Sequence, residues 1–230
     1  MVIAGAFNAA KGLKELDLED DPIKFPQPSH SIRVQKDMIA VGALEPDTEL
    51  MLRVREGHTE SFAVLLGKHR GPVIHFLYRM VQNQAVAEEL AQEVFLRVYK
   101  SRGNYEPTAK FTTWLFRIAS HLALNHIRDF KNERNQGSID ESSDDGLTLQ
   151  VADRGMTTEQ TLVYKVKLDE VRRAIQMLPE KQRAAVLMHK YQEMEYSQIA
   201  SVLECSESAV KSLLFRAYET LRVRLAHMAR

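Results

Sequence analysis

Hydrophobic and polar positions from residue 47 onward follow a helical rather than an alternating pattern. Apolar residues recur at i, i+3 and i+4, as in the stretch FAVLLGKHRGPVIHFLYRMV, and this spacing places them on one face of a helix. No run of alternating β-branched residues, which would indicate a strand, occurs in the sequence. The pattern therefore predicts an all-α protein.

Capping residues and helix breakers divide this pattern into elements. Asp47 is expected to cap a first helix that Gly57 closes, and Asn83 to cap a later one. Between them, Pro72 is expected to kink or split a long helix, because proline removes a backbone donor and clashes with the preceding turn. The loop 101–110 then precedes a helix that begins at residue 111.

The helical pattern is absent from two segments. The first 46 residues have weak periodicity and contain the polar, Pro-rich run DDPIKFPQPS, which indicates a disordered arm; Met38 is a candidate start of translation. Residues 135–158 are acidic, with Gly, Ser and little periodicity, as in a flexible linker. We therefore expect two small helical domains, 47–134 and 159–230, joined by a flexible acidic linker (135–158) and preceded by a disordered arm (1–46).

The stretch SQIASVLECSESAVKSLLFRAYETLR carries two apolar faces on either side of a short polar break. Ser197 and Ser206 are expected to cap the two helices. The apolar faces comprise Ile199, Val202 and Leu203 in the first helix and Val210, Leu213, Leu214, Ala217 and Leu221 in the second. Two short helices joined by about three residues have the spacing of a helix-turn-helix.

The side of the second helix that faces away from Val210 combines basic, hydroxyl and aromatic residues. They are Ser208, Lys211, Ser212, Phe215 and Arg216. Lys and Arg bind phosphates or guanine edges, Ser bonds to either, and an aromatic ring contacts a thymine methyl group. We interpret this helix as a recognition helix; the alternative is an ordinary solvated face with one exposed Phe.

Charge is segregated along the chain, although its formal net charge is zero. Lys100–Arg134 carries seven Lys or Arg against three acids, whereas 135–160 carries one against six. From Ser206 onward there are five basic residues against two acids. Two basic segments on either side of an acidic one predict two nucleic-acid surfaces on one chain.

The helix that begins at residue 111 carries a basic strip opposite its apolar face. The strip runs through Arg117, His121, Leu124 and Arg128, with Asn125 and Trp114 at its border. Basic groups beside an amide and an aromatic ring suit nucleic acid. For Trp114 we favour a place in the core.

The loop before this helix offers Tyr105, with Asn104 and Lys110 nearby. An aromatic ring accompanied by hydrogen-bond donors is suited to holding an unstacked base. The alternative is a plain surface turn.

A third candidate surface lies on the helix that follows Asn83. Opposite its apolar face are Glu89, Gln92, Glu93 and Leu96. A Leu within an acidic face is a candidate contact for another protein; the alternative is an ordinary exposed Leu.

The sequence offers little for catalysis, metals or membranes. The eight His residues lack metal-ligand spacing, and the chain has no Gly-rich phosphate loop, nucleophile elbow or HExxH motif. The chain is therefore expected to be neither an enzyme nor a cofactor binder. A single Cys205, no apolar run of membrane-spanning length and no signal-peptide pattern favour the cytoplasm.

Three stretches together resemble the extracytoplasmic-function (ECF) group of bacterial sigma factors. They are AEELAQEVFLRVYK, FTTWLFRIASHLALNHIR and LPEKQRAAVLMHKYQEMEYSQIASVLECSESAVKSLLFRAYETLR, and the resemblance covers about 47–134 and 159–225. It implies a promoter-specificity subunit of bacterial RNA polymerase whose first domain (sigma region 2) docks on the core enzyme and melts the minus-ten element. The second domain (sigma region 4) would read the minus-thirty-five element with its helix-turn-helix.

The resemblance also assigns roles to residues. It implies core-polymerase docking by Glu89, Gln92, Glu93 and Leu96. It implies that the loop 101–110, with Tyr105, captures a flipped minus-ten base and that Arg117 and Asn125 lie beside it; we add Asn104, Lys110, His121 and Arg128 as expected minus-ten contacts from the residue pattern. It implies minus-thirty-five contacts by Lys211, Ser212, Phe215 and Arg216, and we add Ser208 from the same helix face. Leu213 departs from the family, in which a basic residue is usual there, and the first 46 residues lie outside the shared pattern.

The resemblance also implies partners, and two other functions are alternatives to it. The family implies the RNA polymerase core, promoter DNA and an anti-sigma factor as partners, and a stress or envelope signal as the trigger. One alternative is an autonomous helix-turn-helix regulator that binds an operator as a dimer, which would leave the basic strip at Arg117 unexplained. Another is a decoy that mimics a sigma factor to occupy its regulator.

Overall fold

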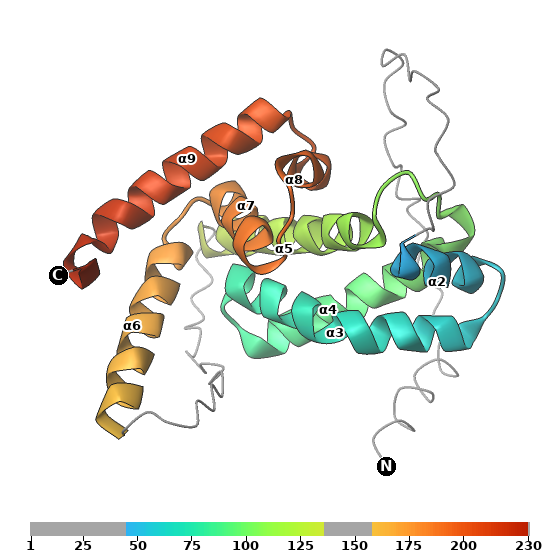
Figure 1. Cartoon of the computed structure of the whole chain (residues 1–230), viewed down its shortest axis with the longest axis horizontal. Helices are drawn as coiled ribbons and strands as arrows, with labels where there is room; N and C mark the ends of the chain where they lie inside the picture. Colours follow the sequence, from blue (N-terminus) through green and yellow to red (C-terminus); the bar gives the residue numbers. More distant parts are fainter. Residues whose placement is uncertain (1–44, 136–157, 230) are drawn as a thin grey trace. The chain divides into compact units, whose positions relative to one another are not determined.

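The computed structural model describes residues 45–135 and 158–229, and all regular elements in these ranges are helical (Figure 1). The helices are α2 (Pro46–Arg55), α3 (Thr59–Val81), α4 (Gln84–Lys100), η2 (Ser101–Asn104), α5 (Phe111–Asn135), α6 (Thr158–Gln176), α7 (Glu180–Tyr191), α8 (Tyr196–Leu203), α9 (Glu207–Arg224) and η3 (Ala226–Ala229). The all-α prediction is confirmed. The predicted arm, the candidate start at Met38 and all but the ends of the predicted linker lie outside the described residues.

Helices α2 to α5 form a bundle around α3. Helix α3 packs against α2 and α4, and α5 packs against both α3 and α4. The apolar residues that the sequence pattern placed on one face of α3 are indeed inside, since Leu65, Val73 and Leu77 are fully buried. Pro72 does not split this helix, which is continuous from Thr59 to Val81. Tertiary packing on both sides of Pro72 outweighs the loss of one backbone hydrogen bond.

Asp47 was expected to cap the first helix, but it does not. The N-cap is Glu45, two residues earlier, and the helix begins at Pro46, whose fixed φ suits a first helical position. The Asp47 carboxylate is buried and lies 2.7 Å from Lys68 Nζ and 2.9 Å from His69 Nε2. A buried carboxylate needs such partners, because desolvation without them is costly. Asp47 therefore joins α2 to α3.

The predicted helix-turn-helix is present in the second part of the chain. Helices α8 and α9 are joined by three residues, 204–206. Ser206 caps α9 by accepting a hydrogen bond from the Ala209 amide at 3.2 Å, as predicted. The cap predicted at Ser197 is wrong. Instead Glu195 precedes α8 and forms a capping box with Gln198, which satisfies two backbone amides reciprocally.

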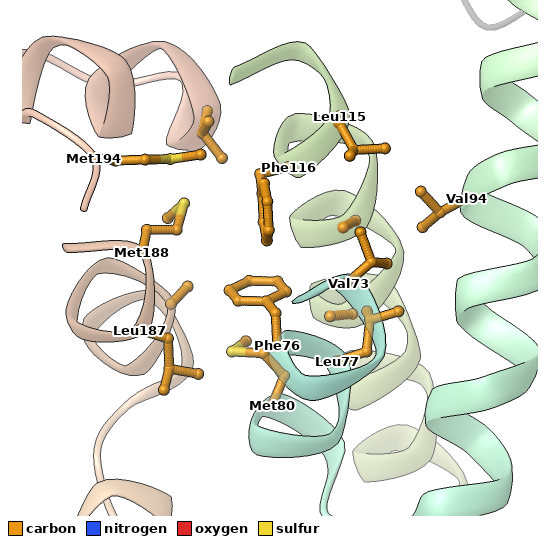
Figure 2. Close-up of a cluster of buried hydrophobic side chains, with 14 of the residues drawn as sticks. Val73, Phe76, Leu77, Met80, Val94, Leu115, Phe116, Leu187, Met188 and Met194 are labelled. Atoms are coloured by element: carbon orange, nitrogen blue, oxygen red, sulfur yellow. The ribbon is translucent and has the colours of Figure 1, made fainter. Parts of the chain in front are cut away.

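One hydrophobic cluster of the described residues includes helices from both predicted domains. Figure 2 shows Phe76 and Met80 of α3 facing Leu187 and Met188 of α7, with Phe116 of α5 next to Phe76. The rings of Phe76 and Phe116 meet edge to face, with centroids 5.3 Å apart. All five side chains are essentially excluded from solvent. The sequence indicated two units joined by a linker and did not predict this shared core.

Polar contacts border the shared cluster. Arg183 of α7 donates a hydrogen bond from Nη1 to the Met80 carbonyl at 2.6 Å, and Gln198 of α8 lies 3.4 Å from the Thr113 hydroxyl of α5. None of the helices in the two described ranges has the length and apolarity that a membrane crossing requires.

Candidate nucleic-acid interfaces

The recognition face of α9 has the division between inside and outside that its sequence predicts. Val210, Leu214 and Ala217 are buried against α7 and α8. The predicted contact residues are all exposed on the other side: Ser208, Lys211, Ser212, Phe215 and Arg216. Helical periodicity alone produces this separation, because residues three and four apart share a face. Leu213, at the position that departs from the family pattern, is half-buried.

Phe215 is the unusual member of this face. Its side chain is 68% exposed, although a large aromatic ring gains free energy when it is buried. It lines a shallow hollow together with Lys211, Ser212 and Arg216. Two cationic side chains, a hydroxyl and an exposed ring therefore lie together on one helix face. This combination can bind phosphates and base edges and contact a methyl group in a major groove.

Backbone contacts hold part of this face in place. The Ser212 hydroxyl donates to the Ser208 carbonyl at 3.0 Å, and Arg216 Nε donates to the Ser212 carbonyl at 3.2 Å. The Arg216 guanidinium has further N–H groups beyond Nε, in a planar fork that can bind a guanine edge. Arg216 is thus oriented along the helix, and the N–H groups of its two terminal nitrogens can bind DNA.

The basic strip on α5 is only partly open. His121 and Arg128 are exposed, and Asn125 is half-buried with its amide nitrogen 3.4 Å from His121 Nδ1. Arg117 is half-buried and bonds to Glu204, which follows α8, with Nη2 2.6 Å from Oε1. Arg117 therefore has an acidic partner within the chain, which the sequence did not predict. Trp114 packs against Tyr105 and Phe111, as a place in the core implies.

The loop before α5 differs from the expectation at its central residue. Asn104 and Lys110 are exposed, but Tyr105 is only 2% exposed. Its ring packs against Phe111 and Trp114, with centroid distances of 6.4 and 5.0 Å. Burial raises the pKa of the Tyr105 phenol, which stays neutral at physiological pH.

The expectation that the Tyr105 ring is free to stack on a base is therefore wrong for this conformation. An aromatic residue in a polar loop can either stack on a base or pack in the core, and only its tertiary contacts show which of the two it does. In this loop the ring is an anchor, and of the three predicted contact residues only Asn104 and Lys110 are exposed.

The candidate docking face on α4 lies opposite a buried stripe. Glu89 and Gln92 are exposed, while Glu93 and Leu96 are half-buried. Glu93 bonds to Arg97 one turn along the helix, with Oε1 2.5 Å from Nε. Beneath them, Ala87, Ala91, Val94 and Val98 are buried in the bundle. The face is thus accessible to another protein along one side of α4.

Sequence reasoning missed three residues that bear on these surfaces. Glu204 pairs with Arg117, and Arg55 and Glu45 hydrogen-bond to the backbone at 105 and 111. Each contact spans 50 or more positions of the chain, so no local pattern indicates it. The one local signal is that Glu204 lies in the turn of the helix-turn-helix, close to the proposed DNA surface.

Comparisons with known proteins point to one family. Residues 65–133 match the family described as Sigma-70 region 2, and residues 168–221 match Sigma-70, region 4. The chain is 30% identical over 181 residues to the RNA polymerase sigma-H factor of Pseudomonas aeruginosa, covering 77% of this chain and 92% of that protein. It is 29% identical over 175 residues to the ECF RNA polymerase sigma factor SigW of Bacillus subtilis, covering 75% and 93%.

Two solved structures share the fold at lower identity. One is the sigma factor RpoE in complex with the anti-sigma factor NepR from Bartonella quintana, with a TM-score of 0.57, 21% identity, and coverage of 73% of this chain and 98% of that chain. The other is CnrH in complex with the cytosolic domain of CnrY, with a TM-score of 0.58, 19% identity, and coverage of 80% and 99%.

Proposed function

This chain belongs to the ECF group of RNA polymerase sigma factors, and from that premise we propose how its surfaces divide the work. Helix α9 reads the minus-thirty-five element. Helix α5 and the loop 101–110 act on the minus-ten element. Helix α4 docks on the polymerase core. The reaction itself is carried out by the polymerase, and the sigma factor supplies promoter specificity.

The α9 face is the observation that carries this proposal. Phe215 is 68% exposed beside Lys211 and Arg216, on a helix whose opposite side is buried. Keeping such a ring in water has no stabilising effect on the folded chain, whereas a thymine methyl group offers it an apolar contact. The two cations supply the phosphate and base-edge contacts that a recognition helix needs. Ser208 and Ser212 add hydroxyl groups that bond to either.

The minus-ten surface is proposed on the exposed and half-buried polar residues of α5 and its loop. They are Asn104, Lys110, Arg117, His121, Asn125 and Arg128. Tyr105 contributes through the position it gives its neighbours, because its ring is buried. Arg117 becomes available to DNA when its ion pair with Glu204 opens. The docking surface is proposed on Glu89, Gln92, Glu93 and Leu96.

Run-off transcription with purified core polymerase tests the proposal. The full chain is added to core enzyme, and RNA is measured from a library of promoter fragments selected for binding to the reconstituted holoenzyme. We expect promoter-dependent RNA that requires both the chain and the core. Tight DNA binding by the chain alone, without transcription, would instead identify an autonomous regulator. Neither DNA binding nor transcription, together with capture of a regulator, would identify a decoy.

We further propose an anti-sigma factor as a partner, with release on a stress or envelope signal in the cytoplasm. Two structures of similar fold are complexes with an anti-sigma factor or with the cytosolic domain of a partner, which motivates the test. Deleting the gene for a bound regulator, identified by pull-down from the native cell, should raise transcription from the chain's own promoters. Unchanged transcription would remove that regulator from consideration.

A further inference from the structure

The loop 101–110 is attached to the bundle at both of its ends by the same short helix. Helix α2 contacts both η2, where the loop begins, and α5, which follows the loop. Between these points the chain from Glu106 to Lys110 is exposed. A loop tethered at two points has fewer conformations to lose when it meets a ligand, so the tethers influence what it binds.

Arg55 makes the first attachment. It is the last residue of α2, and its Nη1 donates a hydrogen bond to the Tyr105 carbonyl at 3.1 Å. A hydrogen bond from a guanidinium is charge-assisted and stronger than one between neutral groups. The ring of the same Tyr105 is buried against Trp114 and Phe111. Backbone and side chain at position 105 are thus held by different partners.

Glu45 makes the second attachment. Its Oε2 accepts a hydrogen bond from the Phe111 amide at 3.3 Å and another from the Thr48 hydroxyl at 3.2 Å. Phe111 is the first residue of α5, so its amide is one of those that have no partner within the helix. A carboxylate at this helix end also interacts favourably with the helix dipole. Glu45 therefore sets where the loop ends and α5 begins.

Asp47 anchors helix α2, which ends at Arg55 and has Glu45 as its N-cap. Its buried carboxylate bonds to Lys68 and His69 of α3, and the His69 ring in turn packs against Phe111 with centroids 5.4 Å apart. Helix α2 is therefore fixed to α3 independently of the loop. A fixed α2 can impose a position on the loop rather than follow it.

We propose that α2 is a brace that sets the base preference of the holoenzyme at the minus-ten element. Arg55 and Glu45 are its positioning residues, and they act through the loop without touching DNA. This inference rests on the proposed function of the loop. Discrimination between bases requires functional groups to be held within about half an ångström, so a loosened loop loses selectivity before it loses binding.

The test measures base preference at the minus-ten element in reconstituted holoenzyme. Open-complex formation is compared on promoters that carry every single substitution in that element, with the minus-thirty-five element unchanged. Arg55→Ala should reduce discrimination between preferred and substituted bases by roughly fivefold, since one charge-assisted hydrogen bond is removed. Arg55→Lys, which keeps one donor, should restore part of it. Glu45→Ala should resemble Arg55→Ala, and Glu45→Gln, which keeps an acceptor oxygen, should be milder.

Arg53 is the matched control on the same helix. It is exposed and pairs with Glu49 at 2.6 Å, one turn away, and Arg53→Ala should leave discrimination unchanged. Core-polymerase affinity, preference at the minus-thirty-five element and thermal melting of each variant are measured alongside. All three quantities should be the same for Arg55→Ala as for the parent chain. A variant that had lost structure generally would change them.

Two loop variants, Asn104→Ala and Lys110→Ala, separate the inference from its premise. If they alter minus-ten discrimination and Arg55→Ala does not, the loop has its proposed function and the brace is overturned. If neither loop variant alters it, the proposed role of the loop fails, and the brace fails with it. An equal loss of transcription from all promoters in Arg55→Ala would also overturn the brace.

Discussion

Arg216 and Lys211 are both exposed on α9, but their surroundings suggest different tasks. Arg216 lies about two turns into the helix, and one of its donors, Nε, bonds to the Ser212 carbonyl. Lys211 lies nearer the start of the helix, toward the edge of the face. A planar fork that is already oriented suits a base edge, whereas a flexible ammonium group suits phosphate.

We predict that the two residues separate in a specificity assay. Arg216→Ala should cost about 1–3 kcal/mol of promoter affinity and relax the preference at one base of the minus-thirty-five element. Lys211→Ala should weaken binding evenly across sequences and reduce the salt dependence by roughly one ion. The measurement is holoenzyme binding to promoters with every single substitution in that element, at two salt concentrations. Equal, sequence-independent losses would mean that α9 contacts only the DNA backbone.

Tyr105 shows how burial changes the meaning of a residue. Its ring packs in the bundle, so Tyr105→Ala should leave a cavity and reduce the free energy of unfolding by about 3–5 kcal/mol, as for other buried aromatic residues. Tyr105→Phe keeps the ring and should have a small effect. Urea denaturation of both variants measures this.

A second readout distinguishes an anchor from a stacking ring. If Tyr105 stacked on a flipped base, a promoter melted in advance at the minus-ten element would rescue transcription by Tyr105→Ala. The structure leads us to expect little rescue, because the defect lies in the fold of the loop. A stable Tyr105→Ala variant that is fully rescued would contradict this assignment.

At the scale of elements, α4 presents its two sides to different surroundings. The stripe from Ala87 to Val98 is buried in the bundle, and Leu96 lies on the other side next to Glu93. We predict that Leu96→Asp weakens binding to core polymerase by tenfold or more, because it places a charge where an apolar contact is expected. A tenfold change in Kd corresponds to about 1.4 kcal/mol of binding free energy. Affinity for labelled core enzyme is the measurement.

Val64 provides a control for this prediction on α3. It is apolar and 55% exposed, so Val64→Asp adds the same charge at a helix surface that has no proposed role. Both variants should melt close to the parent temperature. Equal losses of polymerase affinity from the two would show that the added charge acts non-specifically, and the α4 docking surface would lose its support.

On the scale of the whole molecule, one ion pair connects the two proposed DNA surfaces. Arg117 of α5 bonds to Glu204 in the turn before the recognition helix, and their side chains are 36% and 57% exposed. Exposed pairs of this kind contribute roughly 0.2–1 kcal/mol. The buried contacts around Phe116 and Met188 therefore contribute more free energy to holding the two domains together than the ion pair does. The ion pair can be removed without unfolding either domain.

We predict that Glu204→Gln raises the affinity of the free chain for single-stranded minus-ten DNA, by at most about fivefold. The substitution removes the charge of Glu204 but keeps the shape of its side chain. Glu204 has a positive φ of 52°, so a substitution that keeps this shape is preferred. Fluorescence anisotropy with a labelled oligonucleotide measures the change. Glu207→Gln is the control, because it removes an exposed acid three residues away, outside this pair. The same increase in both variants would attribute the effect to net charge alone.

Features that depend on local spacing could be predicted from the order of the residues alone. The buried line of Val210, Leu214 and Ala217 and the exposed face of Phe215 and Arg216 follow from helical periodicity. The caps at Asn83 and Ser206 follow from short-range hydrogen bonding, since each side chain accepts from an amide three residues on. The all-α fold and the helix-turn-helix were predictable for the same reason, because a helix is a local structure whose pattern repeats every few residues.

Contacts between residues that are far apart in the sequence became visible in the three-dimensional structure. Asp47 was expected at a helix end but is buried with Lys68 and His69, and Tyr105 was expected in solvent but packs beside Trp114. Arg117 has the properties of a DNA contact, yet it pairs with Glu204, 87 positions away. A side chain's type shows what it can bind, whereas burial and long-range packing determine which partner it has. These depend on how whole helices pack, and local spacing carries no information about that.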